Sequence, residues 1–250
     1  MIRKEFSEGF DTLVNSYRRF RGFDNKEATD SIEFNEHEKS FFLTKAQEEI
    51  IIELYTGKNP YGESFEVTEE LRRYLESLIQ EATRNPLTGS LVTSVKGLDN
   101  GKSDGKHFYF QLPTDLWFIT YESVKLGNSE DDCMDGKTLE VTPTRQDEYH
   151  RIRKNPFRGA NRRRALRFDL SGNKVEIVCE YPVASYYVRY LKRLAPIVLE
   201  ALPNNLTINT NGGPSDCEVH TALHQRILER AVNLGLRSKG YIFNNNNNRE

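Results

Sequence analysis

The sequence predicts an α+β protein, in which a bundle of N- and C-terminal helices brackets a mainly antiparallel β domain. Near both ends of the chain, apolar residues recur every three or four positions, which is the spacing of one face of an α-helix. In the middle, segments rich in aromatic and β-branched residues alternate between apolar and polar positions and are separated by turn residues. The helical segments lie far apart in the sequence and most simply pack on each other, so the β region is expected to be an insertion between them.

Three helices are predicted before the β region and one after it. The first follows from four apolar residues at helical spacing: Phe6, Phe10, Leu13 and Tyr17. In the second, Thr44 is expected to cap the helix, Gln47 to complete a capping box and Gly57 to end it. The third starts at Thr68 and has an apolar face of five residues: Leu71, Leu75, Leu78, Ile79 and Ala82. The last helix has a similar face: Leu223, Ile227, Leu228, Ala231 and Val232.

About five or six strands are predicted in the middle of the chain. Four of them are expected at these places: before a turn at Pro113, over residues 117–126, over residues 138–144 and within residues 185–194. Alternating apolar residues on both sides of a Ser-Gly-Asn turn at residues 171–173 predict a β-hairpin. A short helix is predicted over residues 144–154.

These elements divide the chain into three parts. Residues 1–88 together with 215–240 are predicted to form a helical body, and residues 89–214 a β-rich insertion domain. Residues 241–250 include five consecutive asparagines and are expected to be a flexible tail.

Composition and charge narrow the class of function. The chain has 250 residues, with 35 Lys and Arg against 37 Asp and Glu, so its formal net charge is -2. A domain devoted to nucleic acid usually carries a large positive excess, which this chain lacks. The hydrophobic fraction of 37% is low for a self-sufficient globule and suits a protein whose elements are completed by neighbouring subunits.

Cysteine usage and hydropathy indicate the cellular compartment in which the protein is expected. Cys133, Cys179 and Cys217 show no CxxC spacing, which indicates a reducing compartment and no disulfide framework. The N-terminal segment lacks the apolar core of a signal peptide, and no apolar run is long enough to span a bilayer. A soluble, unexported protein without a membrane partner is therefore expected.

The sequence shows no local motif for nucleophilic or acid–base catalysis, so neither an enzyme nor a cofactor is expected. Residues 101–103, Gly-Lys-Ser, resemble part of a phosphate-binding loop, but the first glycine of that motif is missing and a strand follows. The best metal candidate is the set Cys217, His220 and His224, because a helix would place both imidazoles on one face near the thiol. A fourth ligand is not evident, and surface or interface histidines at a helix start are the alternative.

The densest positive charge lies between residues 151 and 167, where eight Lys and Arg residues occur without an acidic one. Five arginines of this stretch are candidate binding residues: Arg158, Arg162, Arg163, Arg164 and Arg167. Tyrosines and basic residues are also interleaved around Tyr186, Arg189 and Tyr190. Tyr and Arg are enriched at protein interfaces and also stack on bases. Composition therefore leaves three uses open: contact with protein, contact with nucleic acid, and a solvated loop.

The order of segments along the chain resembles a known family. Virion structural proteins of crAss-like short-tailed bacteriophages are similar to this chain in five segments: "EFSEGFDTLVNSY", "FFLTKAQEEIIIELYTGKN", "LPTDLWFITYESV", "RIRKNPFRGANRRRALRFDL" and "CEVHTALHQRILERAVNLGLRS". More broadly, the layout is similar to the tail-adaptor, or head–tail connector, proteins of short-tailed phages. The resemblance covers nearly the whole chain.

This resemblance implies a ring of identical subunits, typically about twelve, that docks under the portal protein and continues the DNA channel into the tail. It also implies contacts with a neighbouring tail ring or fibre-type proteins, and passing contact with packaged DNA, in a virion assembled in the bacterial host cytoplasm. The residues predicted to form subunit or ring-to-ring contacts are Phe6, Phe10, Arg158, Arg162, Arg163, Arg164, Tyr186, Arg189 and Tyr190. The alternative is a nucleic-acid-binding protein that uses the basic cluster at residues 158–167.

Overall fold

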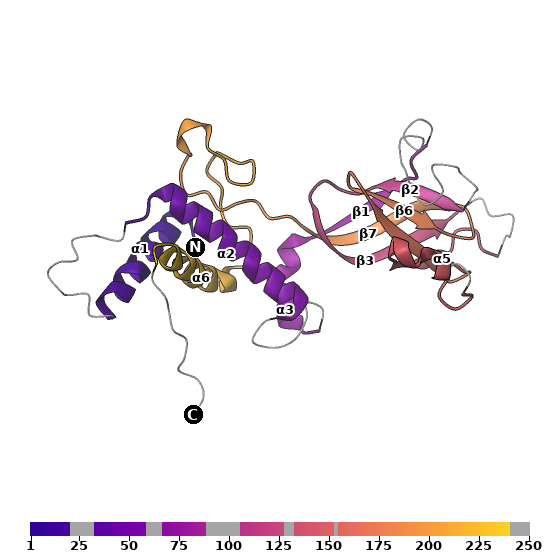
Figure 1. Ribbon diagram of the computed structural model, residues 1–250, viewed down its shortest axis with the longest axis horizontal. Coiled ribbons are helices and arrows are strands. Elements are labelled where there is room, and N and C mark those ends of the chain that lie inside the picture. Colours follow the sequence, from indigo (N-terminus) through magenta and orange to yellow (C-terminus); the bar gives the residue numbers. More distant parts are fainter. Residues whose placement is uncertain (21–32, 59–66, 89–105, 128–132, 153–154, 241–250) are drawn as a thin grey trace, which may run out of the picture. The chain divides into compact units, whose positions relative to one another are not determined.

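A computed structural model describes residues 1–20, 33–58, 67–88, 106–127, 133–152 and 155–240 (Figure 1). The predicted Asn-rich tail and the Gly-Lys-Ser sequence at residues 101–103 lie outside these residues. The chain separates into two compact units, which we call the helical unit (residues 1–78 and 194–250) and the β unit (residues 79–193). The structure is α+β and its sheet is mostly antiparallel, as the sequence predicts.

The core of the helical unit is formed by three helices, the amphipathic α1 (Arg3–Phe20) and α6 (His224–Ser238) and the more extensively buried α2 (Glu36–Thr56). Figure 1 shows α6 beside α1 and α2, and it packs against both of them. The first and last predicted helices are confirmed. On the first, Phe6 and Phe10 are buried as predicted, whereas Leu13 and Tyr17 are half-buried and Val14 is buried instead. The buried residues include Phe6, Phe10, Leu43, Ile50, Leu54, Ile227, Leu228, Ala231 and Val232.

The start of α2 differs from the prediction. The helix begins at Glu36 and its N-cap is Asn35, whose side chain accepts a hydrogen bond from the Glu38 N–H (2.7 Å). The Glu38 carboxylate accepts one from the Asn35 N–H (3.0 Å), which completes a capping box. The capping role predicted for Thr44 and Gln47 is therefore wrong, since both lie inside the helix and are buried.

Thr44 and Gln47 instead attach α2 to the segment that follows the β unit. The Thr44 hydroxyl accepts a hydrogen bond from the Ile197 N–H (3.0 Å), and Gln47 donates one to the Ala195 carbonyl (3.0 Å). A polar residue in a buried helix face is stable where it satisfies backbone groups in this way. At the other end, Gly57 terminates α2 in the left-handed conformation (φ 77°), as predicted.

The third predicted helix is shorter than expected. α3 covers Glu69–Leu75, a 3₁₀ turn η1 covers Glu76–Leu78, and the chain then enters strand β1 (Ile79–Arg84). The helix prediction is wrong for the last two residues of its apolar face, which lie in β1. Their helix-like spacing is overridden by antiparallel backbone pairing with strand β7.

With β1, the described residues form seven strands, whereas five or six were predicted. The others are β2 (His107–Gln111), β3 (Leu116–Leu126), β4 (Thr138–Pro143), β5 (Arg164–Leu170), β6 (Lys174–Val178) and β7 (Val183–Lys192). Their order in the sheet is β1-β7-β3-β4-β5-β6-β2. All neighbours are antiparallel except β4 and β5. The predicted hairpin is β5–β6, and the predicted short helix is present as a 3₁₀ turn followed by α5 (Tyr149–Ile152).

The sheet is curled around its own core. The Leu87 N–H donates a hydrogen bond to the Tyr109 carbonyl (2.7 Å), which joins the chain after edge strand β1 to edge strand β2. The inner face buries a large apolar cluster that includes Phe110, Val124, Leu126, Val175, Ile177 and Val188. A smaller cluster under α5 contains Tyr149, Ile152, Leu166, Phe168 and Val178. Among the described residues, no helix has the length and apolar character needed to cross a membrane.

Candidate functional site

A folded loop presents most of the predicted basic cluster. We call residues 155–163, which connect α5 to β5, the arginine loop. The Asn155 side chain accepts a hydrogen bond from the Phe157 N–H (2.9 Å), and its backbone carbonyl accepts one from the Gly159 N–H (2.7 Å). Arg164 Nη1 donates to the Phe157 carbonyl (3.1 Å). These bonds fix the backbone of the loop, while the Phe157 side chain is 85% exposed.

The five candidate arginines have different environments. Arg158, Arg162 and Arg163 are exposed, Arg164 is half-buried, and the Arg167 guanidinium lies largely inside the β unit. Arg162 Nε donates a hydrogen bond to the Tyr181 hydroxyl (3.0 Å). Two more members of the basic stretch, at residues 153 and 154, lie outside the described residues.

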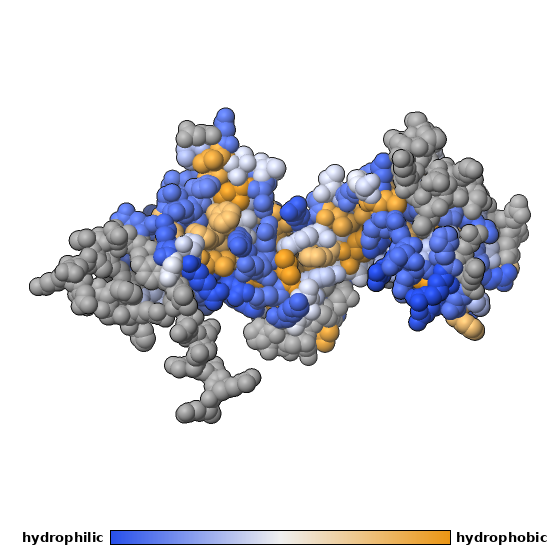
Figure 2. Space-filling view, viewed as in Figure 1, coloured by the Kyte–Doolittle hydropathy of each residue, from blue (hydrophilic) through white to orange (hydrophobic). Residues whose placement is uncertain are grey.

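An open hollow next to the arginine loop adds to its positive surface. Lys137, Arg162 and Arg163 line it, together with Cys133, Met134, Thr138 and Leu139. Figure 2 shows strongly hydrophilic surface over the region of α5 in the β unit. Cationic side chains around a hollow suit an anionic group, such as a carboxylate of another protein or a phosphate.

Arg167 has a partner inside the β unit. Its Nη1 lies 2.9 Å from Glu122 Oε1, and the Tyr186 hydroxyl donates to Glu122 Oε2 (2.7 Å). Burial raises the pKa of the Glu122 carboxyl, while the Arg167 charge and the Tyr186 hydrogen bond oppose that rise. Burial and the neighbouring carboxylate also raise the pKa of Tyr186. Arg167 thus contributes to the interior of the unit and is turned away from the exposed basic surface.

The two faces of β7 separate Tyr186 and Tyr190 of the predicted interface from Arg189. Tyr186 and Tyr190 lie on the inner face, where they are 0% and 5% exposed. Arg189 and Tyr187 lie on the outer face, and the Tyr187 ring is 6.1 Å from the ring of Tyr121 on β3. Tyr121 is 49% exposed, so Tyr121, Tyr187 and Arg189 form an aromatic and basic surface, of which Arg189 alone is among the predicted interface residues. The alternation of faces along a strand is the signal that identifies it.

Phe6 and Phe10 are core residues of the helical unit. They are 1% and 0% exposed, and the Phe6 ring packs 5.3 Å from the ring of His224. Gly235 allows α6 to approach, because a Cβ at this position would lie 3.2 Å from the Phe10 ring. Both phenylalanines therefore hold α1 against α6 within one chain and offer no surface to a neighbouring copy.

Cys217, His220 and His224 are engaged with separate groups. His220 caps the short 3₁₀ turn before α6, so the two imidazoles do not share a helix face. The His224 Nε2 donates to the Val219 backbone carbonyl (2.9 Å), and the Cys217 thiol donates to the side-chain amide oxygen of Gln47 (3.2 Å). Burial raises the pKa of Cys217 to about 11. Within the described ranges, no group of three or more His, Cys, Asp or Glu residues is placed to hold a metal ion.

A buried pair of titratable groups lies under α5. His107 Nδ1 is 2.7 Å from Glu176 Oε1, and the Tyr109 hydroxyl donates to the same oxygen (3.3 Å). Tyr149 of α5 packs against His107 with its ring centroid 6.3 Å away. Glu176 is fully buried and His107 is 8% exposed, so the pair is part of the interior of the β unit.

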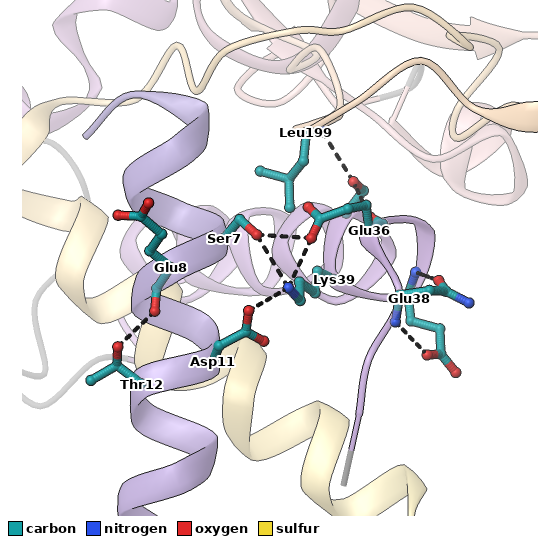
Figure 3. Close-up of polar contacts among 10 residues, drawn as sticks. Ser7, Glu8, Asp11, Thr12, Glu36, Glu38, Lys39 and Leu199 are labelled. Atoms are coloured by element: carbon teal, nitrogen blue, oxygen red, sulfur yellow. Dashed lines mark hydrogen bonds and ion pairs between the residues drawn. The ribbon is translucent and has the colours of Figure 1, made fainter. Parts of the chain in front are cut away.

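A second polar cluster joins α1 to α2 in the helical unit (Figure 3). The buried Lys39 ammonium donates to Asp11 (2.7 Å), Glu36 (2.8 Å) and Ser7 (3.1 Å). Burial opposes the charge on Lys39, but the hydrogen bonds and attraction of the two carboxylates outweigh it and raise the pKa of Lys39. The Ser7 hydroxyl in turn donates to Glu36 (2.9 Å).

Next to this cluster the helical unit has an open groove, which we call the α1 groove. Its lining residues are Ile2, Arg3, Lys4, Ser7, Glu8, Glu36, Leu199, Glu200 and Asp216. Apolar contact is offered by Leu199 and by Ile2, which is 63% exposed. The lining holds four carboxylates and two cations, and both cations are paired within the groove, Arg3 with Asp216 (2.9 Å) and Lys4 with Glu8 (3.7 Å). The excess of carboxylates gives the groove a net negative charge, opposite to that of the arginine loop.

Comparison with known proteins identifies the family to which the chain belongs. A family model described as "Phage tail ring protein 3/4" matches residues 1–247. The chain is 41% identical over 247 residues to "Ring protein 3" of Bacteroides phage crAss001, covering 98% of this chain and 99% of that protein. It is 28% identical over 239 residues to "Ring protein 4/5" of the same phage, covering 92% and 90% of the two chains.

Proposed function

Since the chain belongs to the phage tail ring protein 3/4 family, we propose that it is a structural subunit of a ring in the virion of a crAss-like phage. The observation that carries this proposal is the match over 247 residues, which includes both the helical and the β unit. The buried state of the His107–Glu176 pair agrees with a structural rather than a catalytic role.

We further propose that the ring belongs to the head–tail connector beneath the portal protein and continues the DNA channel into the tail. The ring would contain about twelve copies, consistent with the closed cyclic symmetry of most homo-oligomers. Its other partners would be the portal, a neighbouring tail ring or fibre-type proteins, and DNA in passing. A net charge of -2 supports this placement, because a wall of the channel must let DNA move without holding it.

Cryo-electron microscopy of purified virions tests both levels of the proposal. We expect a closed ring into which the helical and β units fit, located between the portal and the tail. Mass spectrometry of the same particles should detect the chain at a constant ratio to the portal protein. Particles that contain no copy of the chain would exclude the structural role, and a ring far from the portal would exclude the connector placement.

Nucleic-acid binding is the second candidate function, favoured by the exposed Arg158, Arg162 and Arg163. Each phosphate that these arginines neutralise adds about -0.9 to the slope of log affinity against log salt on duplex DNA. A slope of several units for the purified chain, lost when the three arginines are changed to Gln, would support this function. A weak and nearly salt-independent interaction would exclude it.

A further inference from the structure

Charge is divided unequally between the two units. Residues 79–193, which form the β unit, contain 19 Lys and Arg against 15 Asp and Glu. The rest of the chain contains 16 Lys and Arg against 22 Asp and Glu. The near-neutral total therefore hides a positive β unit and a negative helical unit, and units of opposite charge on different copies attract each other.

Each of these units also exposes a large apolar side chain within its own charged surroundings. On the β unit this is Phe157, which is 85% exposed and adjoins the exposed Arg158. On the helical unit it is Ile2, 63% exposed, in the α1 groove beside carboxylates such as Glu200. An exposed aromatic side chain beside arginines, facing an apolar site with an excess of carboxylates, is a combination that protein interfaces use.

The geometry of the two surfaces is complementary as well. The arginine loop projects one aromatic ring, and its backbone is held by Asn155 and Arg164, so little ordering is needed on binding. The α1 groove is a hollow of about 670 Å³, a size that takes a ring and a guanidinium. Leu199 and Ile2 offer apolar contact, and Glu200 supplies a carboxylate. Glu8 and Asp216 are also carboxylates of the lining, and on binding the arginines of the loop would share them with their partners Lys4 and Arg3.

We propose that the arginine loop of one copy docks into the α1 groove of the next copy, with Phe157 against Ile2 and Leu199 and the exposed arginines against the groove carboxylates. This inference rests on the proposed ring, and it identifies the two surfaces through which neighbouring copies of the ring make contact. A ring requires a head-to-tail contact between two different patches of the same chain, and this pair meets that requirement. Duplex DNA would use the arginines through its phosphates but would gain nothing from the exposed Phe157.

Charge reversal on either side gives the test. The loop variant Arg158→Glu/Arg163→Glu and the groove variant Glu8→Arg/Glu200→Arg change exposed side chains, and circular dichroism and thermal unfolding check that both fold. We expect each variant alone to lose rings, with subunit association weakened by about 100-fold or more, since attraction becomes repulsion. The matched controls are Arg145→Glu and Glu229→Arg, which are exposed residues of the same units outside the two surfaces.

Mixing the variants makes the test specific. The loop variant retains an intact groove, the groove variant retains an intact loop, and the reversed loop also matches the reversed groove. Neither variant should form rings alone, but an equimolar mixture should form rings of alternating copies. Combining all four substitutions in one chain should restore rings, because the reversed charges again match. Native mass spectrometry of the purified chains, and incorporation into particles in infected cells, report the assembly state.

Failure of this contact is distinguishable from failure of the ring role. A wild-type chain that forms no ring in solution and is absent from particles overturns the proposed function, and the contact with it. A wild-type chain that forms rings while both variants also form them overturns the contact and leaves the ring role intact. Rings retained with loss of duplex DNA binding in the loop variant would assign the loop to DNA and also overturn the contact.

Discussion

Arg167 and Glu122 form an ion pair inside the curled sheet, with 2.9 Å between Nη1 and Oε1. The Tyr186 hydroxyl satisfies the other carboxylate oxygen, and Arg167 Nε lies 3.2 Å from Asp169 on the rim. In the sequence, Arg167 is the last member of a run of basic residues that suggests a binding surface. In the structure, its guanidinium links β5 to β3 across the interior of the sheet, so Arg167 stabilises the fold of the β unit.

Replacing Arg167 by Met should destabilise the β unit by about 3–5 kcal/mol at neutral pH, because it leaves the Glu122 carboxylate buried without its cation. The Glu122 pKa is already raised above its ordinary value of 4.5 and would rise further. A group whose pKa is raised by folding stabilises the fold fully below its unfolded pKa and loses that contribution as pH rises through the folded pKa. The loss caused by Arg167→Met should therefore be small near pH 4 and largest at neutral pH, measured by urea unfolding.

The double variant Glu122→Gln/Arg167→Met serves as the control. It removes both charges and keeps an acceptor for the Tyr186 hydroxyl, so part of the lost stability should return. A loss from Arg167→Met that is equal at all pH values would contradict the role of Glu122 as its buried partner.

Tyr186→Phe should lower the free energy of unfolding by about 1–3 kcal/mol, because it removes the hydroxyl that donates to the buried Glu122. Tyr187→Phe is the matched control on the outer face of the same strand and should change stability by no more than about 0.5 kcal/mol. Chemical denaturation of the two variants measures the difference. An equal loss of unfolding free energy in the two variants would contradict the placement of Tyr186 on the inner face of β7 and Tyr187 on its outer face.

The pattern of residues predicts most of the fold because burial of apolar faces determines it. The stripes of α1 and α6, the hairpin β5–β6 and the α+β class all follow from spacing alone. Strand β1 does not, since Ile79 and Ala82 continue a helical stripe and become strand through pairing with the distant β7. A local pattern carries no information about a partner contributed by a later part of the chain.

The candidate site is only partly visible in the sequence for the same reason. Residue type identifies Arg158, Arg162 and Arg163, which the structure places on an exposed loop. It does not distinguish them from Arg167, because the partner that buries Arg167 lies on β3. The groove on the helical unit was not predicted at all, since its lining comes from four segments that are separate in sequence.

Cysteine reactivity should follow burial. Cys133 is exposed, Cys179 is buried with a raised pKa, and burial raises the pKa of Cys217 to about 11. Since the thiolate is the reactive form, iodoacetamide at pH 8 should modify Cys133 in the native chain and the other two after unfolding. Peptide mass spectrometry over time measures the order. Rapid labelling of Cys217 in the native chain would contradict its buried contact with Gln47.

The start of α2 can be tested at its cap. Asn35→Ala should cost about 1 kcal/mol, because it removes the acceptor for the Glu38 N–H, while Asn35→Ser should retain most of the stability. Asn15→Ala, at an exposed position within α1, is the control and should be neutral or slightly stabilising. Thermal unfolding compares the three variants. A neutral Asn35→Ala would contradict the capping box at this position.

Lys39 should stabilise the contact between α1 and α2 through its charge as well as its packing. Lys39→Met keeps an apolar stem but leaves Asp11 and Glu36 without the shared cation (Figure 3). Because the Asp11 side chain is 51% exposed, water compensates part of the loss, and we expect a cost of about 1–2 kcal/mol in urea unfolding at pH 7.

The pH dependence separates the charge of Lys39 from its packing. Folding raises the pKa of Lys39 above its ordinary value of 10.5, so its contribution is complete below pH 10.5 and is lost as pH rises through the folded pKa. The stability difference between wild type and Lys39→Met should therefore shrink at alkaline pH, and also in acid, where the carboxylates become protonated. Lys39→Met/Asp11→Asn should recover part of the loss at pH 7, because one uncompensated carboxylate is removed. A difference that stays constant with pH, together with no recovery in the double variant, would show that Lys39 acts through packing alone.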